Sequence, residues 1–238
     1  MDINVLLNSF LSVDNPMLPS PPAMRVALYL VWAIVLGAGT LLLAGRLARP
    51  YRLGLALAVM AWTLLPGPNS PAYWLGLAFQ TPSLMNAMIG LAWFSGLARR
   101  APGSGAAAPR PQVLALKILL VAGVVLGWVL LFDTLAWLPV SVYAWGFSSA
   151  AVAAVVVCAT LLWVVWGAAP ASPAASGLPG FLLLLSVLTL FVLSRLPTGN
   201  LWDALLDPWL WVALQIGLLI SVARRLLAAR RSPPATRA

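Results

Sequence analysis

The sequence predicts an all-α protein, a polytopic transmembrane helix bundle with about seven spans. Of its 238 residues, 62% are hydrophobic and 8% are charged, whereas soluble domains carry about 25% charged residues. The apolar residues form long runs, and a helix needs about 20 such residues to cross a bilayer. The basic residues lie beside these runs and mostly on one side, which is typical of membrane topology. We expect residues 24–227 to form a single transmembrane helical domain.

The N-terminal segment, residues 1–23, is predicted to lie at the membrane interface. Its apolar residues favour a short helix on the membrane surface, and the prolines between positions 16 and 22 end that helix. Asp2 and Asp14 stand where a signal peptide would carry positive charge, so we expect this segment to be uncleaved. The first span follows from Met24 to Gly45.

The next two apolar runs are shorter than a full span. They are Leu53–Leu65 and Leu84–Ala98, and both fall below the length that crosses a bilayer. The first of them follows a basic turn that carries Arg46, Arg49 and Arg52. We count these two runs as the second and third spans.

The stretch Pro66–Asn86 interrupts the helical pattern with four prolines and two glycines. Ser70 before Pro71, and Thr81 before Pro82, each have the pattern of an N-cap followed by proline at the first helical position. We therefore predict a short helix, a break and a new helix. A Pro/Gly-broken or re-entrant element of this kind is a sequence pointer to a transporter-type site.

Two other structures fit the same stretch. One is an outer loop with a single amphipathic turn, anchored at the headgroups by Tyr73 and Trp74. The other is one long helix from Ala72 to Ala98 with a kink at Pro82.

The fourth to seventh spans are predicted at Val113–Phe132, Ser141–Trp166, Leu178–Ser194 and Trp209–Ala223. In the fourth span, Gly123 and Gly127 have the GxxxG spacing that permits close helix packing. Cys158, the one cysteine, lies in the middle of the fifth span, and we expect it to be buried and unreactive.

The connector before the last span contains a helix signal. Asn200 predicts the N-cap of a short helix through Leu206, with Asp203 in the favourable first turn. After the last span, residues 228–238 are predicted to form a basic, disordered cytoplasmic tail.

The distribution of positive charge predicts an orientation with the N-terminus outside and the C-terminus in the cytoplasm. Only Arg25 and Arg195 then lie outside. Twelve basic residues lie in the cytoplasm: Arg46, Arg49, Arg52, Arg99, Arg100, Arg110, Lys117, Arg224, Arg225, Arg230, Arg231 and Arg237.

The residue types exclude several kinds of chemistry. The chain has no histidine, which rules out a histidine-ligated haem and a histidine-based triad. No Walker loop, GxGxxG, GxSxG or HExxH pattern occurs. The middle of every predicted span lacks an ionisable residue, which argues against proton-coupled transport. We therefore expect no cofactor and no metal, and the arginines beside apolar runs indicate no nucleic-acid partner.

The candidate site is a set of polar and aromatic residues on the outer side. Asp203 and Asp207, four residues apart, would share a helix face, where two carboxylates can hold a cation or form a solvated surface. Asp133 and Arg195 end spans on the same side and would pair across the bundle. The candidate substrate- or partner-binding residues are Asn69, Tyr73, Trp74, Gln80, Asn86, Asp133, Arg195, Asp203 and Asp207.

Three functional hypotheses follow from these observations. We favour a non-catalytic subunit or accessory scaffold of a membrane complex, with the lipid bilayer and another membrane protein or a second copy as partners. The alternative is a permease-like protein for a neutral or lipid-like substrate, with its site at 66–86. The third is a membrane enzyme that acts on lipid-linked substrates through the outer Asp residues. A composition rich in Ala, Arg, Pro and Trp but poor in Lys favours a bacterial inner membrane as the location.

Overall fold

The computed structural model describes residues 11–13, 16–99, 110–167 and 178–231, which form helices and no strands. The prediction of an all-α protein is confirmed. The described elements are α2 (Pro21–Leu43), α3 (Arg49–Thr63), the short 3-10 helix η1 (Gly67–Asn69), α4 (Pro71–Phe79), α5 (Leu84–Arg99), α6 (Arg110–Thr134), α7 (Val142–Trp145), α8 (Ser149–Gly167), α9 (Leu178–Ser194), α10 (Leu201–Leu205) and α11 (Pro208–Arg231).

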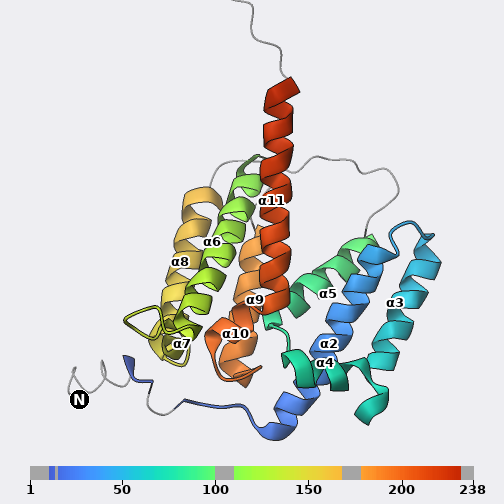
Figure 1. Cartoon of the computed structure of the whole chain (residues 1–238), viewed down its shortest axis with the longest axis horizontal. Coiled ribbons are helices and arrows are strands. Elements are labelled where there is room, and N and C mark those ends of the chain that lie inside the picture. The colour runs from blue at the N-terminus through green and yellow to red at the C-terminus, as the bar shows by residue number, and fades with distance from the viewer. Residues whose placement is uncertain (1–10, 14–15, 100–109, 168–177, 232–238) are drawn as a thin grey trace, which may run out of the picture.

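The long helices form two groups, which are in contact through α5 (Figure 1). In the N-terminal group, α2 packs against both α3 and α5. In the C-terminal group, α8 packs against α6 and α9, and α6 packs against α11. Contacts of α5 with α9 and α10 join the two groups.

The two ends of the bundle differ in charge. The short elements η1, α4, α7 and α10 gather at one end, the lower end in Figure 1, together with Asp133, Asp203 and Asp207. We call this the acidic end. The opposite, basic end carries the α2–α3 turn with its arginines and the C-terminal part of α11. Most of the predicted interfacial segment and tail lies outside the described residues, including Asp2, Asp14 and Arg237.

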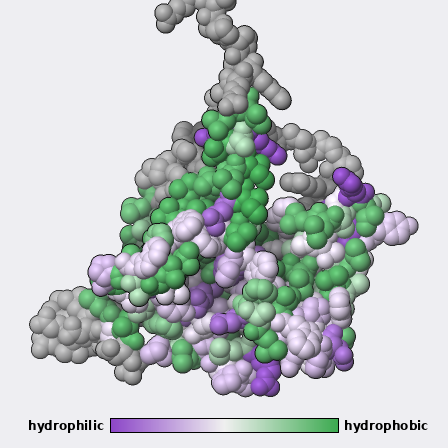
Figure 2. Space-filling view, viewed as in Figure 1, coloured by the Kyte–Doolittle hydropathy of each residue, from purple (hydrophilic) through white to green (hydrophobic). Residues whose placement is uncertain are grey.

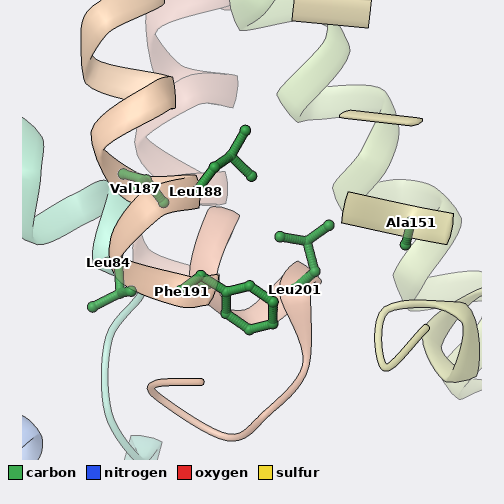
Figure 3. Packing of buried hydrophobic residues seen from close by; sticks show 7 residues of the cluster. Leu84, Ala151, Val187, Leu188, Phe191 and Leu201 are labelled. Carbon is green, nitrogen blue, oxygen red and sulfur yellow. The ribbon is translucent and has the colours of Figure 1, made fainter. Parts of the chain in front are cut away.

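The best-packed core lies near the acidic end, where the two groups meet. Leu84 of α5 lies in one cluster with Val187, Leu188 and Phe191 of α9 and with Leu201 of α10 (Figure 3). Phe191 and Leu201 are fully buried. The short helix α10 is therefore fixed by burial and not only by its own backbone bonds, because burying a large apolar side chain contributes about 1.5–3 kcal/mol.

Among the described residues, two helices are long and apolar enough to cross a membrane. They are Pro21–Leu43 and Pro208–Leu227, and four shorter apolar helices are Leu84–Ser95, Leu119–Thr134, Ser149–Leu161 and Gly180–Ser194. Length and composition of two helices are weak evidence of a membrane location, because a buried core helix and a signal sequence pass the same test.

In the stretch Pro66–Asn86, α4 and α5 are separate helices, so the alternative of one kinked helix is wrong. Ser70 caps α4 by accepting a hydrogen bond from the Ala72 N–H at 3.0 Å, as predicted. The start of α5 differs from the prediction: it follows Ser83 and not Thr81. The Ser83 hydroxyl accepts the Asn86 N–H at 3.1 Å, which caps this helix.

The predicted fifth span is two helices. The helix is interrupted between α7 and α8. Gly146 lies there so close to the Asn200 side chain that a Cβ at this position would be 1.9 Å from Asn200 Oδ1. The Ser148 hydroxyl then caps α8 through the Ala151 N–H. Cys158 of α8 is exposed on the protein, and not buried as expected. A helix that is apolar all round does not reveal from its sequence which face packs inward.

Candidate functional site

Asp207 is the most highly connected acidic side chain of the acidic end. It caps α11 by accepting the Leu210 N–H at 2.8 Å. Across the molecule it also accepts the N–H and the hydroxyl of Ser83, at 2.8 and 2.6 Å, and the side-chain amide of Asn86 at 3.1 Å. Only 7% of Asp207 is exposed. A buried carboxylate is stabilised when donors satisfy its oxygens, and here those donors come from two helices.

This contact joins the N-terminal group to the C-terminal group at the starts of α5 and α11. The Phe79 ring at the end of α4 packs edge-on against Trp209 of α11, with 4.9 Å between the ring centres. We call Asp207 with Ser83 and Asn86 the carboxylate clasp. Asn86 and Asp207 are predicted site residues that the structure brings together, whereas sequence reasoning missed Ser83.

Asp203 lies in a second hydrogen-bonded cluster. It accepts the Thr198 hydroxyl at 2.5 Å and the Tyr143 hydroxyl at 2.8 Å. The pKa of Tyr143 is raised well above its ordinary value, first by burial and then by the hydrogen bond to Asp203 and the negative charge of that carboxylate. Tyr143 thus acts as a donor that holds α7 to α10.

Asn200 completes the junction between α7 and α10. It is fully buried, and it caps α10 as predicted by accepting the Trp202 N–H at 2.9 Å. Its amide donates to the Tyr143 carbonyl at 2.9 Å, and the Trp202 indole donates to the Val142 carbonyl at 2.9 Å. These bonds satisfy backbone groups that the break after α7 leaves without helical partners.

Asp203 and Asp207 do not share a helix face, so that prediction is wrong. Helix α10 ends at Leu205 and the backbone at Leu206 is extended, which places Asp207 at the start of a different helix. The tertiary contacts of Asp207 override the helical spacing. Within the described ranges, no three His, Cys, Asp or Glu side chains come together as a set of metal ligands.

Asp133 and Arg195 do not form the predicted ion pair. Asp133 is half-buried and accepts the Tyr143 N–H at 2.6 Å and the Ser141 hydroxyl at 3.4 Å. The Arg195 guanidinium instead lies 5.4 Å from the centre of the Phe191 ring, and its buried Nε donates no hydrogen bond.

The remaining candidate residues lie in the broken stretch, where tryptophan indoles close the turns. Trp62 donates to the Asn69 carbonyl at 2.9 Å, and Trp32 donates to the Gln80 carbonyl at 2.9 Å. Gln80 has a φ of 60°, a conformation uncommon for a residue other than glycine. The Trp32 contact holds this residue where α4 ends.

Tyr73 and Trp74 pack against each other on the first turn of α4. Their rings are edge-on at 5.2 Å, and the Trp74 indole donates to the Pro68 carbonyl at 2.8 Å. Trp74 is 60% exposed and Leu77 of the same helix is 69% exposed, so both side chains are open to lipid or to a partner.

Gly123 and Gly127 lie on the face of α6 that meets α11. A Cβ at Gly123 would be 2.7 Å from Leu214, and one at Gly127 would be 2.2 Å from the Trp211 ring. Trp211 also donates to the Val124 carbonyl at 3.2 Å. The absence of side chains at these two positions is what lets the large Trp211 ring lie against the α6 backbone.

Sequence reasoning missed Ser83, Thr198 and Tyr143 as members of the polar clusters. Ser83 carries a readable signal, because a serine directly before an apolar run favours an N-cap. Thr198 and Tyr143 carry none, since their partner Asp203 lies on another element. No protein-family model, curated protein or solved structure matches this chain.

Proposed function

We propose that this chain is a multi-pass integral membrane protein and a non-catalytic subunit or scaffold of a membrane complex. Two features together support this proposal. The carboxylates at the polar end form hydrogen bonds within the protein, and the sides of the helix bundle are apolar. Each described acid, Asp133, Asp203 and Asp207, accepts at least two hydrogen bonds from the protein. Groups engaged in this way are suited to holding helices together.

The exposed apolar surface supports the membrane location. Large apolar side chains are exposed along α11, where only 6% of the apolar window is buried. Figure 2 shows continuous apolar surface over α11 and the helices beside it. A core helix of a soluble protein would be mostly buried, and exposed apolar area on this scale calls for lipid or a protein partner.

In the proposed topology, the long helices of the described ranges each cross or enter the bilayer, with the acidic end outside and the basic end in the cytoplasm of a bacterial cell. These helices are α2, α3, α5, α6, α8, α9 and α11. The arginine-rich α2–α3 turn then lies on the cytoplasmic side, as the positive-inside rule requires. Helices α3 and α5 have 15 and 16 residues. At about 1.5 Å per residue they span less than the hydrocarbon core, so the bilayer would thin locally around them.

The test is purification from native membranes in mild detergent, followed by measurement of the protein mass and of the stoichiometry of any second chain. The proposal expects a second membrane polypeptide at a fixed ratio, recovered again when that polypeptide carries the tag. A protein of 25.2 kDa recovered without a second chain and with a bound solute would favour the permease alternative.

Single substitutions at the acidic end distinguish the enzyme alternative from the scaffold. Asp133→Asn and Asp203→Asn would abolish activity if these carboxylates performed chemistry. For a scaffold we expect both variants to retain the partner and the cellular function wherever they fold. Loss of function with the complex intact would contradict a non-catalytic role.

A further inference from the structure

The first turn of α3, next to the α2–α3 turn at the basic end, contains a partly buried arginine whose Nε has no hydrogen-bond partner. Arg52 lies on the same side of α3 as the buried residues Ala56 and Thr63, at spacings of four and eleven residues. Its side chain is partly buried, and its buried Nε donates no hydrogen bond. A guanidinium taken out of water is costly unless an anion compensates it.

The described part of the chain offers no such anion at this end. Its acidic residues, Asp133, Asp203 and Asp207, all lie at the opposite end of the bundle. Arg46 and Arg49 are exposed beside Arg52 and add positive charge. An anion that binds Arg52 would therefore come from outside the described part of the chain.

The surroundings of these arginines favour a lipid over a free ion. Leu43 is 91% exposed and Tyr51 is 73% exposed, and Leu42 and Leu47 are also exposed. Cations beside exposed apolar side chains suit a molecule that carries both a phosphate and acyl chains. Arginine binds phosphate through its planar fork of donors.

We propose that the α2–α3 turn binds the phosphate group of an anionic phospholipid, with Arg52 as the inner side chain and Arg46 and Arg49 at the rim. This inference rests on the membrane location proposed above. Ala48, the residue before α3, has no side-chain cap, so the positive end of the α3 dipole adds to the attraction.

The experiment compares Arg52→Met with Arg224→Met in delipidated protein held in nonionic detergent. Methionine keeps an apolar stem while removing the cation, and Arg224 is an exposed arginine in the C-terminal part of α11. Each variant is titrated with phosphatidylglycerol, with phosphatidylcholine and with inorganic phosphate, and thermal unfolding is followed. Because a ligand of the folded state raises Tm, phosphatidylglycerol should stabilise the native protein and Arg224→Met.

For Arg52→Met we expect an apparent affinity for phosphatidylglycerol about tenfold weaker or worse, since a hydrogen bond to a charged group is lost. Without lipid this variant should unfold at the same temperature as the native protein or higher, because the removed side chain carries a buried Nε donor that has no hydrogen-bond partner. A large fall in Tm, or failure to fold, would mean that Arg52 already has a partner in the protein, and would overturn the proposal.

The other outcomes are equally decisive. If Arg52→Met and Arg224→Met lose the same affinity for phosphatidylglycerol, binding depends only on general attraction between charges, which would overturn a site at the turn. An equal Tm rise with inorganic phosphate would overturn the assignment to a lipid. If carbonate-washed membranes retain the protein and phosphatidylglycerol has no effect, the lipid site is rejected while the membrane location stands.

Discussion

Asp207 joins parts of the chain that are 124 residues apart in sequence. One carboxylate caps α11 and also satisfies Ser83 at the start of α5. The carboxylate oxygens of Asp207 only accept hydrogen bonds. A substitution that introduces a donor at this position therefore places it against the donors of the protein. At the scale of the single residue, the clasp is thus a charge-assisted and highly specific contact.

Asp207→Asn should lower the free energy of unfolding by on the order of 2 kcal/mol or more, because the new amide faces the Ser83 donors inside the protein. Unfolding of the purified protein in detergent measures this loss. The matched control is Asp133→Asn, at a less buried carboxylate that also accepts a backbone N–H, where we expect a loss of about 0.5 kcal/mol. Equal losses at both positions would contradict the clasp.

Tyr143, which lies outside the proposed spans, should lose its phenolic proton at a higher pH than an ordinary tyrosine. The raised pKa means that the folded state holds this proton more tightly than the unfolded chain does. The resulting stability is fully present below the ordinary tyrosine pKa of about 10 and is lost as the pH rises from there through the folded pKa.

Ultraviolet absorbance of tyrosinate, compared between the native protein and Tyr143→Phe, isolates this titration. Asp203→Asn should lower the Tyr143 pKa only in part, because burial is the largest cause and remains. A Tyr143 that titrates like a free tyrosine would show that the side chain is neither buried nor in contact with Asp203.

The contact between α6 and α11 is the clearest packing determinant at the scale of the element. It depends on glycine where the Trp211 ring meets the α6 backbone. Gly127→Ala should destabilise the protein by about 1–3 kcal/mol, because the added methyl group displaces the ring and its hydrogen bond to the Val124 carbonyl.

Gly54→Ala is the control for this prediction. Gly54 lies inside α3 with nothing near the position of a Cβ, so alanine there should be neutral or stabilising by about 0.5–1 kcal/mol. The two variants compared by thermal unfolding separate packing from helix propensity. A Gly127→Ala protein as stable as Gly54→Ala would refute close packing at this contact.

Element starts that depend on local capping were predictable from the sequence, and those that depend on distant partners were not. Ser70 and Asn200 are correct N-caps because each cap bond lies within two residues. The start of α5 and the break before α8 were missed, since the partners are Asp207 and Asn200, from the other end of the chain. The sequence pattern also placed the polar residues at one end without revealing which of them bond.

At the scale of the whole molecule, a polar, hydrogen-bonded end and an apolar exterior are separated in space (Figure 2). Hydropathy predicted the helices, but it did not predict which face of each helix packs inward, as the exposed Cys158 shows. In a helix of uniform apolar composition such as α8, packing against neighbours alone determines that choice.

The most direct test of the central claim is labelling of single cysteines in intact cells and in inside-out vesicles with a water-soluble maleimide. One protein keeps the native Cys158, and two others carry a cysteine at Asn69 or at Arg46 in a Cys158→Ala background. We predict labelling at 69 only from the outside, labelling at 46 only from the cytoplasmic side, and none at Cys158, which lipid would cover. Rapid labelling of Cys158 in the folded protein, or labelling of 69 and 46 from the same side, would contradict a bundle that spans the membrane.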